Sequence, residues 1–126
     1  MEFRGLVPWP QAVPLVEVET GDSTLDLHNW AQFTGVSFAA PESLTLTFLY
    51  STSGAELSRG EGDRIDLRFH SVRNLVITQA PDFDARVVSD LEGWLWQDAG
   101  DGWGRLEFRF GDLVVEFRAK AVELVS

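Results

Sequence analysis

Carboxylates are the residues of this chain with the greatest potential for chemistry, because 20 of its 126 residues are Asp or Glu. Two carboxyl groups at a controlled separation can act as acid and base, or as acid and nucleophile. Closely spaced acids occur at Asp82 and Asp84, Asp90 and Glu92, and Asp98 and Asp101. In so acidic a chain this spacing also arises by chance, and the run from Asp98 to Gly102 is typical of a hairpin turn. We assign no catalytic residue from these pairs.

Histidines offer the next possible site, and only His28 and His70 are present, with no cysteine. Neither lies in a zinc-binding or nucleophile motif. Asp26 and His28 are two residues apart, a spacing that fits a structural hydrogen bond as well as a metal site. His70 lies on the polar side of its predicted strand, where we expect it to be solvated. We therefore predict no metal site, no cofactor and no disulfide bridge.

Five tryptophans are many for a chain of this length. Trp94 and Trp96 share the alternation phase of Asp90 and Glu92. Either the two indoles are buried beneath the N-terminal segment that contains Trp9, or they form an exposed aromatic surface. In the second case Trp94, Trp96, Asp90 and Glu92 are the predicted partner-binding residues.

Alternation of apolar and polar residues with period two is the clearest structural signal. It predicts about seven strands, at residues 16–19, 44–48, 65–70, 75–78, 86–97, 106–110 and 113–125. Turn-rich segments, such as Ser53 to Asp63 and Asp98 to Gly104, join them. We therefore predict one mainly β domain over residues 1–126, folded as an antiparallel sandwich or a half-open barrel.

The last two predicted strands meet at Gly111-Asp112, which is typical of a two-residue hairpin turn. Such a turn sets Phe108 opposite Val115 on one face. On the other face it sets Glu107 opposite Glu116 and Arg105 opposite Arg118. A shift of two residues would pair opposite charges instead, so turn chemistry and charge pairing disagree. We favour the tight turn, because opposite charges still meet diagonally.

At most one short helix is predicted. Asp22, Ser23 and Thr24 can cap it, and its apolar face would hold Leu27, Trp30, Ala31 and Phe33. The same stretch also alternates like a strand around Asp26. The three prolines of the first 14 residues predict an extended N-terminal segment that wraps over a sheet edge.

The formal net charge of −10 limits the partners. Basic residues are interleaved with acids along the sequence, so we expect no binding to nucleic acid or to anionic membranes. The first 18 residues do not resemble a signal peptide, and no apolar run is long enough to span a membrane. We expect a soluble cytoplasmic protein whose acidic surface favours a basic protein partner.

Residues 29–124 carry a resemblance to a known family. Asn29-Trp30-Ala31-Gln32-Phe33 leads into Gly35-Val36-Ser37-Phe38, the run from Ile65 to Ile77 follows, and Val115-Glu116-Phe117-Arg118-Ala119 lies near the end. This arrangement resembles the small, mostly β bacterial proteins grouped as immunity protein family fifty and the related YxiG-like proteins. The resemblance implies a non-catalytic protein that neutralises a cognate toxin by binding it.

Three functions therefore stay open. The first is a non-catalytic protein-binding module, immunity-like, that neutralises a basic toxin. The second is a small carboxylate-dependent hydrolase or a carbohydrate-binding domain that uses tryptophans as a sugar platform. The third is a self-associating structural domain, such as a homodimer formed through an exposed strand edge.

Overall fold

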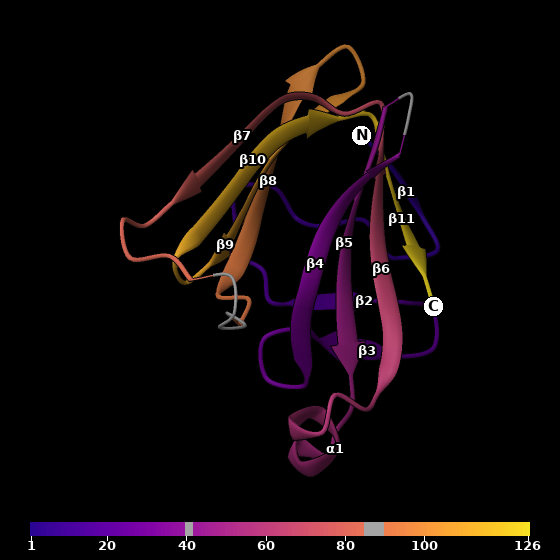
Figure 1. The fold of residues 1–126 in the computed structure, drawn as a ribbon. Helices are drawn as coiled ribbons and strands as arrows, with labels where there is room; N and C mark the ends of the chain where they lie inside the picture. Colours follow the sequence, from indigo (N-terminus) through magenta and orange to yellow (C-terminus); the bar gives the residue numbers. More distant parts are fainter. Residues whose placement is uncertain (40–41, 85–89) are drawn as a thin grey trace.

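Two β-sheets dominate the computed structural model, which describes residues 1–39, 42–84 and 90–126 (Figure 1). One sheet has the strand order β1-β11-β6-β5-β4, the other has the order β7-β10-β9-β8, and a small third sheet pairs β2 with β3. The described strands are β1 (Glu2–Arg4), β2 (Glu17–Glu19), β3 (Thr24–Asp26), β4 (Ala31–Ala39), β5 (Ser43–Tyr50), β6 (Asp63–His70), β7 (Arg73–Gln79), β8 (Gly93–Gly100), β9 (Trp103–Phe110), β10 (Leu113–Ala119) and β11 (Ala121–Val125). The predicted mainly β, sandwich-like architecture is confirmed.

The two large sheets are joined at a corner where two chain segments bend together. β6 continues into β7 after Ser71 and Val72, and β10 continues into β11 after Lys120. β6 pairs with β11 and β7 pairs with β10, so both bends lie at the same place. Ser71 makes its bend with a left-handed φ of 60°, and a 3.0 Å hydrogen bond from Lys120 N to His70 O joins the two bends. From there the sheets diverge, as strands that change sheets at a bend commonly make them do (Figure 1).

The core lies between the two sheets and contains the apolar faces that alternation predicted, together with Leu6, Trp9, Leu27 and Leu91 from other segments. Leu46 and Phe48 of β5 are fully buried, as are Leu106 and Phe108 of β9. Phe69 of β6 joins the layers, because its ring centroid lies 5.7 Å from that of Phe108 and 4.8 Å from that of Phe117. Burying aromatic rings in this way contributes much of the apolar stabilisation of a small β domain.

The N-terminal segment covers the free edge of β8. Ala12 N donates to Trp96 O at 2.9 Å, and Leu15 and Trp94 exchange backbone hydrogen bonds of 2.8 and 2.9 Å. Because the prolines interrupt the donor pattern, the segment pairs with β8 only in part. The prediction that it wraps over a sheet edge is confirmed, but the segment is not extended throughout, because it turns at Gln11 and Ala12, where Ala12 has a φ of 56°.

Of the two alternatives near Asp26, the helix is wrong and the strand is confirmed in part, because that stretch contains β3, a turn and the start of β4. Asp26 ends β3 by accepting hydrogen bonds at Oδ1 from the backbone N–H groups of His28 and Asn29, at 3.0 and 2.8 Å. An Asp side chain that bonds the backbone two and three residues ahead favours a turn over a helix.

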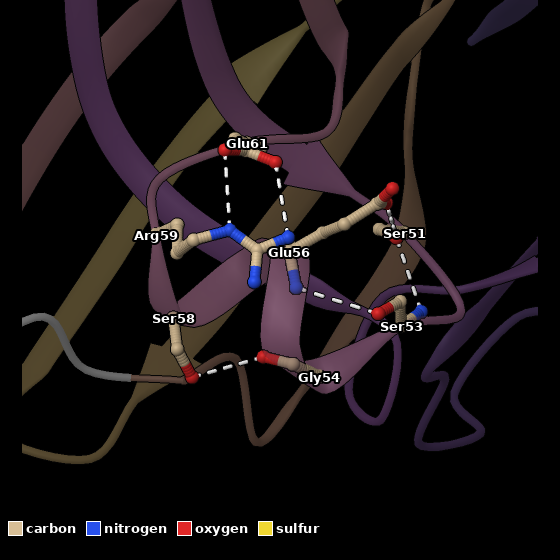
Figure 2. Close-up of polar contacts among 7 residues, drawn as sticks. All are labelled: Ser51, Ser53, Gly54, Glu56, Ser58, Arg59 and Glu61. Atoms are coloured by element: carbon tan, nitrogen blue, oxygen red, sulfur yellow. Dashed lines mark hydrogen bonds and ion pairs between the residues drawn. The ribbon is translucent and has the colours of Figure 1, made fainter.

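The one helix in the described part of the chain is α1 (Gly54–Ser58), within a segment predicted as turns. Figure 2 shows how side chains cap it: Ser53 Oγ accepts from Glu56 N at 3.4 Å, while the Ser51 hydroxyl donates to the Glu56 carboxylate and accepts from Ser53 N. This is a capping box in which a second serine links the two partners.

Two predicted strands have different bounds in the structure. Residues 113–125 form two strands rather than one, because Lys120 lies at the sheet corner. Of residues 86–97, residues 86–89 lie outside the described part, Asp90 to Glu92 belong to no strand, and β8 begins at Gly93.

The tight turn at Gly111-Asp112 is confirmed by the register of β9 and β10, in which Phe108 is opposite Val115 and Glu107 opposite Glu116. Diagonal ion pairs between β9 and β10 were expected, but no ion pair among the described residues joins these two strands. Glu107 instead pairs along its own strand with Arg109, at 3.1 Å.

Candidate functional site

Trp94 and Trp96 are buried in the core, so the first of the two alternatives for them is the one that the structure has. Their exposed fractions are 1% and 7%. In the register of β8 and β9 they lie opposite Phe108 and Leu106 on the inner face. Trp9 covers them, with its ring centroid 5.3 Å from that of Trp94 and its carbonyl accepting a 2.8 Å hydrogen bond from Trp96 Nε1. The two indoles therefore offer no contact surface in this structure.

Asp90 and Glu92 are exposed and precede β8, so they do not share a face with the indoles. β8 begins at Gly93, directly after Glu92, and Leu91 between the two acids is buried. The structure does not bring together the four residues predicted as a partner-binding group.

The carboxylate pairs of the hydrolase hypothesis lie at opposite ends of the second sheet. Asp82 and Asp84 follow the end of β7 that pairs with Leu113 of β10. Asp98 and Asp101 lie at the hairpin between β8 and β9, next to the other end of β10 at Ala119. Strands of this length span about 20 Å, so an acid of one pair cannot act with an acid of the other as a catalytic carboxylate pair. Asp101 has a φ of 55° in the hairpin turn, which confirms the turn predicted there.

Asp26 and His28 form a structural unit. Burial raises the pKa of the Asp26 carboxyl, but the hydrogen bonds from Asn29 and His28 together lower this pKa by more than burial raises it. The pKa of Asp26 therefore lies below its ordinary value. His28 Nδ1 lies 2.6 Å from Leu91 O, which ties the turn to the residues before β8. His70 is half-buried rather than solvated, with Nε2 3.6 Å from a Glu123 carboxylate oxygen. Within the described ranges no group of three metal-ligating side chains comes together.

The free edge of β7 is the most distinctive surface of the described structure. Among the described residues only β10 pairs with β7, so within that part of the chain one row of the backbone groups of β7 is unpaired. Residues 74–79 contain no charge and no proline, and Val76 and Ile77 are 52% and 40% exposed. Val76 lies opposite Glu116 on the outer face, and Ile77 lies opposite the buried Val115 on the inner face. An uncharged, exposed edge strand of this kind is a template for another strand.

Apolar groups of β4 face the beginning of β7. Phe38 lies opposite the buried Leu44, on the inner face of its sheet, yet is 61% exposed. A hollow of about 380 Å³ separates the end of β4 from β7, and Phe38, Val72 and Leu75 are among its lining residues. An added strand along β7 would therefore meet apolar side chains on both of its faces. We call Phe38, Leu75, Val76 and Ile77 the β7 edge site.

A second groove, of about 400 Å³, lies along the N-terminal segment. Pro8, Pro10 and Pro14 line it, together with the exposed Glu17 and Glu19 of β2. No basic side chain of the described residues forms an ion pair with either carboxylate. The groove therefore combines rigid apolar walls with two available negative charges.

The β7 edge site was missed at the sequence level. Its strand was predicted, at residues 75–78, and its lack of charge is visible in the sequence. Whether a strand lies at an edge depends on strand order, which alternation alone does not determine.

Comparison of the chain with protein-family models, with curated proteins and with solved structures found no match. No helix of the described residues is long and apolar enough to cross a membrane.

Proposed function

We propose that this protein is a non-catalytic protein-binding module that takes up an extended segment of its partner along β7. The observation that carries the proposal is the free edge of β7, with Val76 and Ile77 exposed on its two faces. Strand addition uses unpaired backbone groups for affinity and alternate side chains for specificity. Both requirements are met by an uncharged edge beside the Phe38 hollow.

The proposal is tested with a displayed library of random 12-residue peptides, selected on the immobilised protein. We expect selected peptides to slow amide hydrogen exchange at residues 74–79. Val76→Lys should abolish their binding, because a lysine on an edge strand opposes pairing. Val13→Lys is the matched control, since Val13 is similarly exposed but belongs to the N-terminal segment. Protection elsewhere, or undiminished binding to the Val76→Lys variant, would contradict the proposal.

A second candidate is the immunity-like neutralisation of a basic toxin, favoured by the groove at Glu17 and Glu19. Here the aliphatic part of a Lys or Arg side chain would lie against the prolines while its charge meets the carboxylates. If a toxin-like gene lies beside the gene of this protein, its product should bind the wild type. That binding should weaken at least tenfold in a Glu17→Gln, Glu19→Gln variant, the scale of losing a close charge pair. An unchanged affinity would count against this candidate.

A further inference from the structure

Four basic side chains come together on the outer face of the second sheet. Arg118 of β10 lies directly opposite Arg73 of β7 on one side and Arg105 of β9 on the other. The neighbours of Arg118 along its strand, Phe117 and Ala119, are buried, so the arginines point to solvent. Lys120 follows at the corner. We call Arg73, Arg105, Arg118 and Lys120 the basic face.

Trp103 positions two of these charges. The guanidinium carbon of Arg73 and Nζ of Lys120 each lie 5.0 Å from the centre of its ring system. A cation near an aromatic face is attracted by the ring quadrupole. Trp103 therefore holds two like charges near each other at the beginning of β9.

The basic face is left without carboxylate partners in a chain that has twice as many acidic as basic residues. Every other described arginine has an ion pair: these pairs are Arg4 with Glu2, Arg59 with Glu61, Arg64 with Asp66, Arg68 with Glu123, and Arg109 with Glu107. No ion pair among the described residues involves the four members of the basic face.

Three arginines in one cross-strand row break the ordinary rule of sheet pairing, because like charges directly opposite each other repel. The neighbouring row holds Glu107 and Glu116, but Glu107 is paired with Arg109. A local arrangement that costs stability points to a function that needs it. The row therefore fits an anionic ligand.

The row ends at the open edge of β7. A strand added there would place a side chain directly beside Arg73, as the next member of the row. Resting on the strand addition proposed above, we infer that the bound partner segment is acidic and that its carboxylates contact the basic face. The sequence-level expectation of a basic partner follows from net charge, whereas the row that contains Arg73 is positive, although Glu116 lies opposite Val76 and Glu42 lines the hollow next to Arg73.

Two other occupants fit less well. The three arginines span two strand spacings, about 10 Å, so a long nucleic acid would extend from them over the otherwise acidic surface. A second copy that paired its β7 antiparallel around Val76 would place Gln79 opposite Arg73 and leave the row without an anion.

The peptides selected on the protein test this inference directly. At physiological salt the screening length is about 8 Å, so the local surface rather than the net charge governs contacts. Net charge alone would enrich Lys and Arg in the library, whereas the basic face should enrich Asp and Glu. A synthetic copy of a selected peptide, and the same peptide with each Glu or Asp replaced by Gln or Asn, provide a matched pair of probes.

We expect the amide-substituted peptide to bind at least tenfold more weakly than the acidic one, and Arg118→Glu to weaken the acidic peptide by about the same factor. Arg59→Glu, at the residue that follows α1 and away from the second sheet, makes the same change of charge and should leave affinity within about twofold. Circular dichroism spectra and urea midpoints establish that each variant is folded.

Failure of this inference is distinguishable from failure of the strand addition. If both peptides bind equally while Val76→Lys still abolishes binding, the acidic segment is overturned and strand addition stands. If binding does not depend on Val76, strand addition itself fails. If a 12-nucleotide oligothymidine binds more tightly than any selected peptide and is weakened by Arg118→Glu, the face is a nucleic-acid surface. If light scattering shows a dimer that Val76→Lys dissociates, a second copy occupies the edge.

Discussion

The indole Nε1 of Trp96 donates a 2.8 Å hydrogen bond to the backbone carbonyl of Trp9, a residue 87 positions earlier in the chain. This buried bond joins β8 to the N-terminal segment. Around it, Ala12 and Leu15 donate backbone hydrogen bonds to β8. A single side chain thus helps to hold the segment that covers the edge of the second sheet.

Replacing Trp96 with Phe should release part of this cover. The carbonyl of Trp9 would lose a buried donor, at a cost of about 1–3 kcal/mol in the free energy of unfolding. Urea denaturation measures that loss, and amide exchange at Ala12 and Leu15 should accelerate. Trp30→Phe is the control, because Trp30 is 42% exposed. Equal stability of wild type and Trp96→Phe would show that the bond contributes nothing.

Gly93 allows the same segment to approach closely. A Cβ at this position would lie 2.9 Å from Leu15 O, a distance that requires the backbone to move. We expect Gly93→Ala to destabilise the protein by more than about 1 kcal/mol, as overpacking usually does. Gly21→Ala meets no atom within 4 Å and should cost less. Melting temperatures of the two variants, measured side by side, compare the same chemical change at a tight and an open position.

The fold could be predicted from the sequence where one rule acted alone. Alternation identified the buried faces of β5, β6 and β9, and turn chemistry set the hairpin register at Gly111-Asp112. Near Asp26, helix capping and turn formation competed for the same side chain, and the turn prevailed. The same hairpin register set Arg105 opposite Arg118, but Arg73 is distant in sequence, and the pairing of β7 with β10 was needed to complete the row.

The cap of α1 should depend on Ser53 more than on its other serines. Ser53→Ala removes the acceptor for Glu56 N and should lower local stability by about 0.5–2 kcal/mol. Ser58→Ala is the matched control, since the Ser58 hydroxyl only donates back to Gly54 O, at 2.9 Å (Figure 2). Amide exchange at Leu57 and Arg59 reads out the helix. Faster exchange in the Ser58 variant than in the Ser53 variant would refute the assignment of the cap.

Asp26 should make stability depend on pH. Its pKa is lowered in the folded protein, so the folded state binds this proton less readily than the unfolded chain, whose Asp groups titrate near about 3.9. The stabilisation is therefore complete above that pH and is lost as the pH falls toward the folded pKa. Asp26→Ala should cost about 1–2 kcal/mol at pH 7, and the gap to wild type should narrow below about pH 4.

Urea midpoints at pH 7 and pH 3 measure the change, and Glu92→Ala, which removes an exposed carboxylate, controls for the loss of one negative charge. A gap that stays constant between the two pH values would mean that the Asp26 turn is stabilised by its shape and not by its charge.

Repulsion within the arginine row should lower the stability of the free protein. Arg118 is opposite both Arg73 and Arg105, so Arg118→Thr removes two like-charge contacts and also introduces a residue that favours strands. We expect the free energy of unfolding to rise by about 0.2–1 kcal/mol for each contact removed, most clearly at low salt. Arg109→Thr makes the same substitution on the same face but breaks the pair with Glu107, and should bring no such gain. If Arg118→Thr instead destabilised the protein at low salt, the arginine row would stabilise the fold. Its cost in stability could then no longer be used to infer an anionic partner.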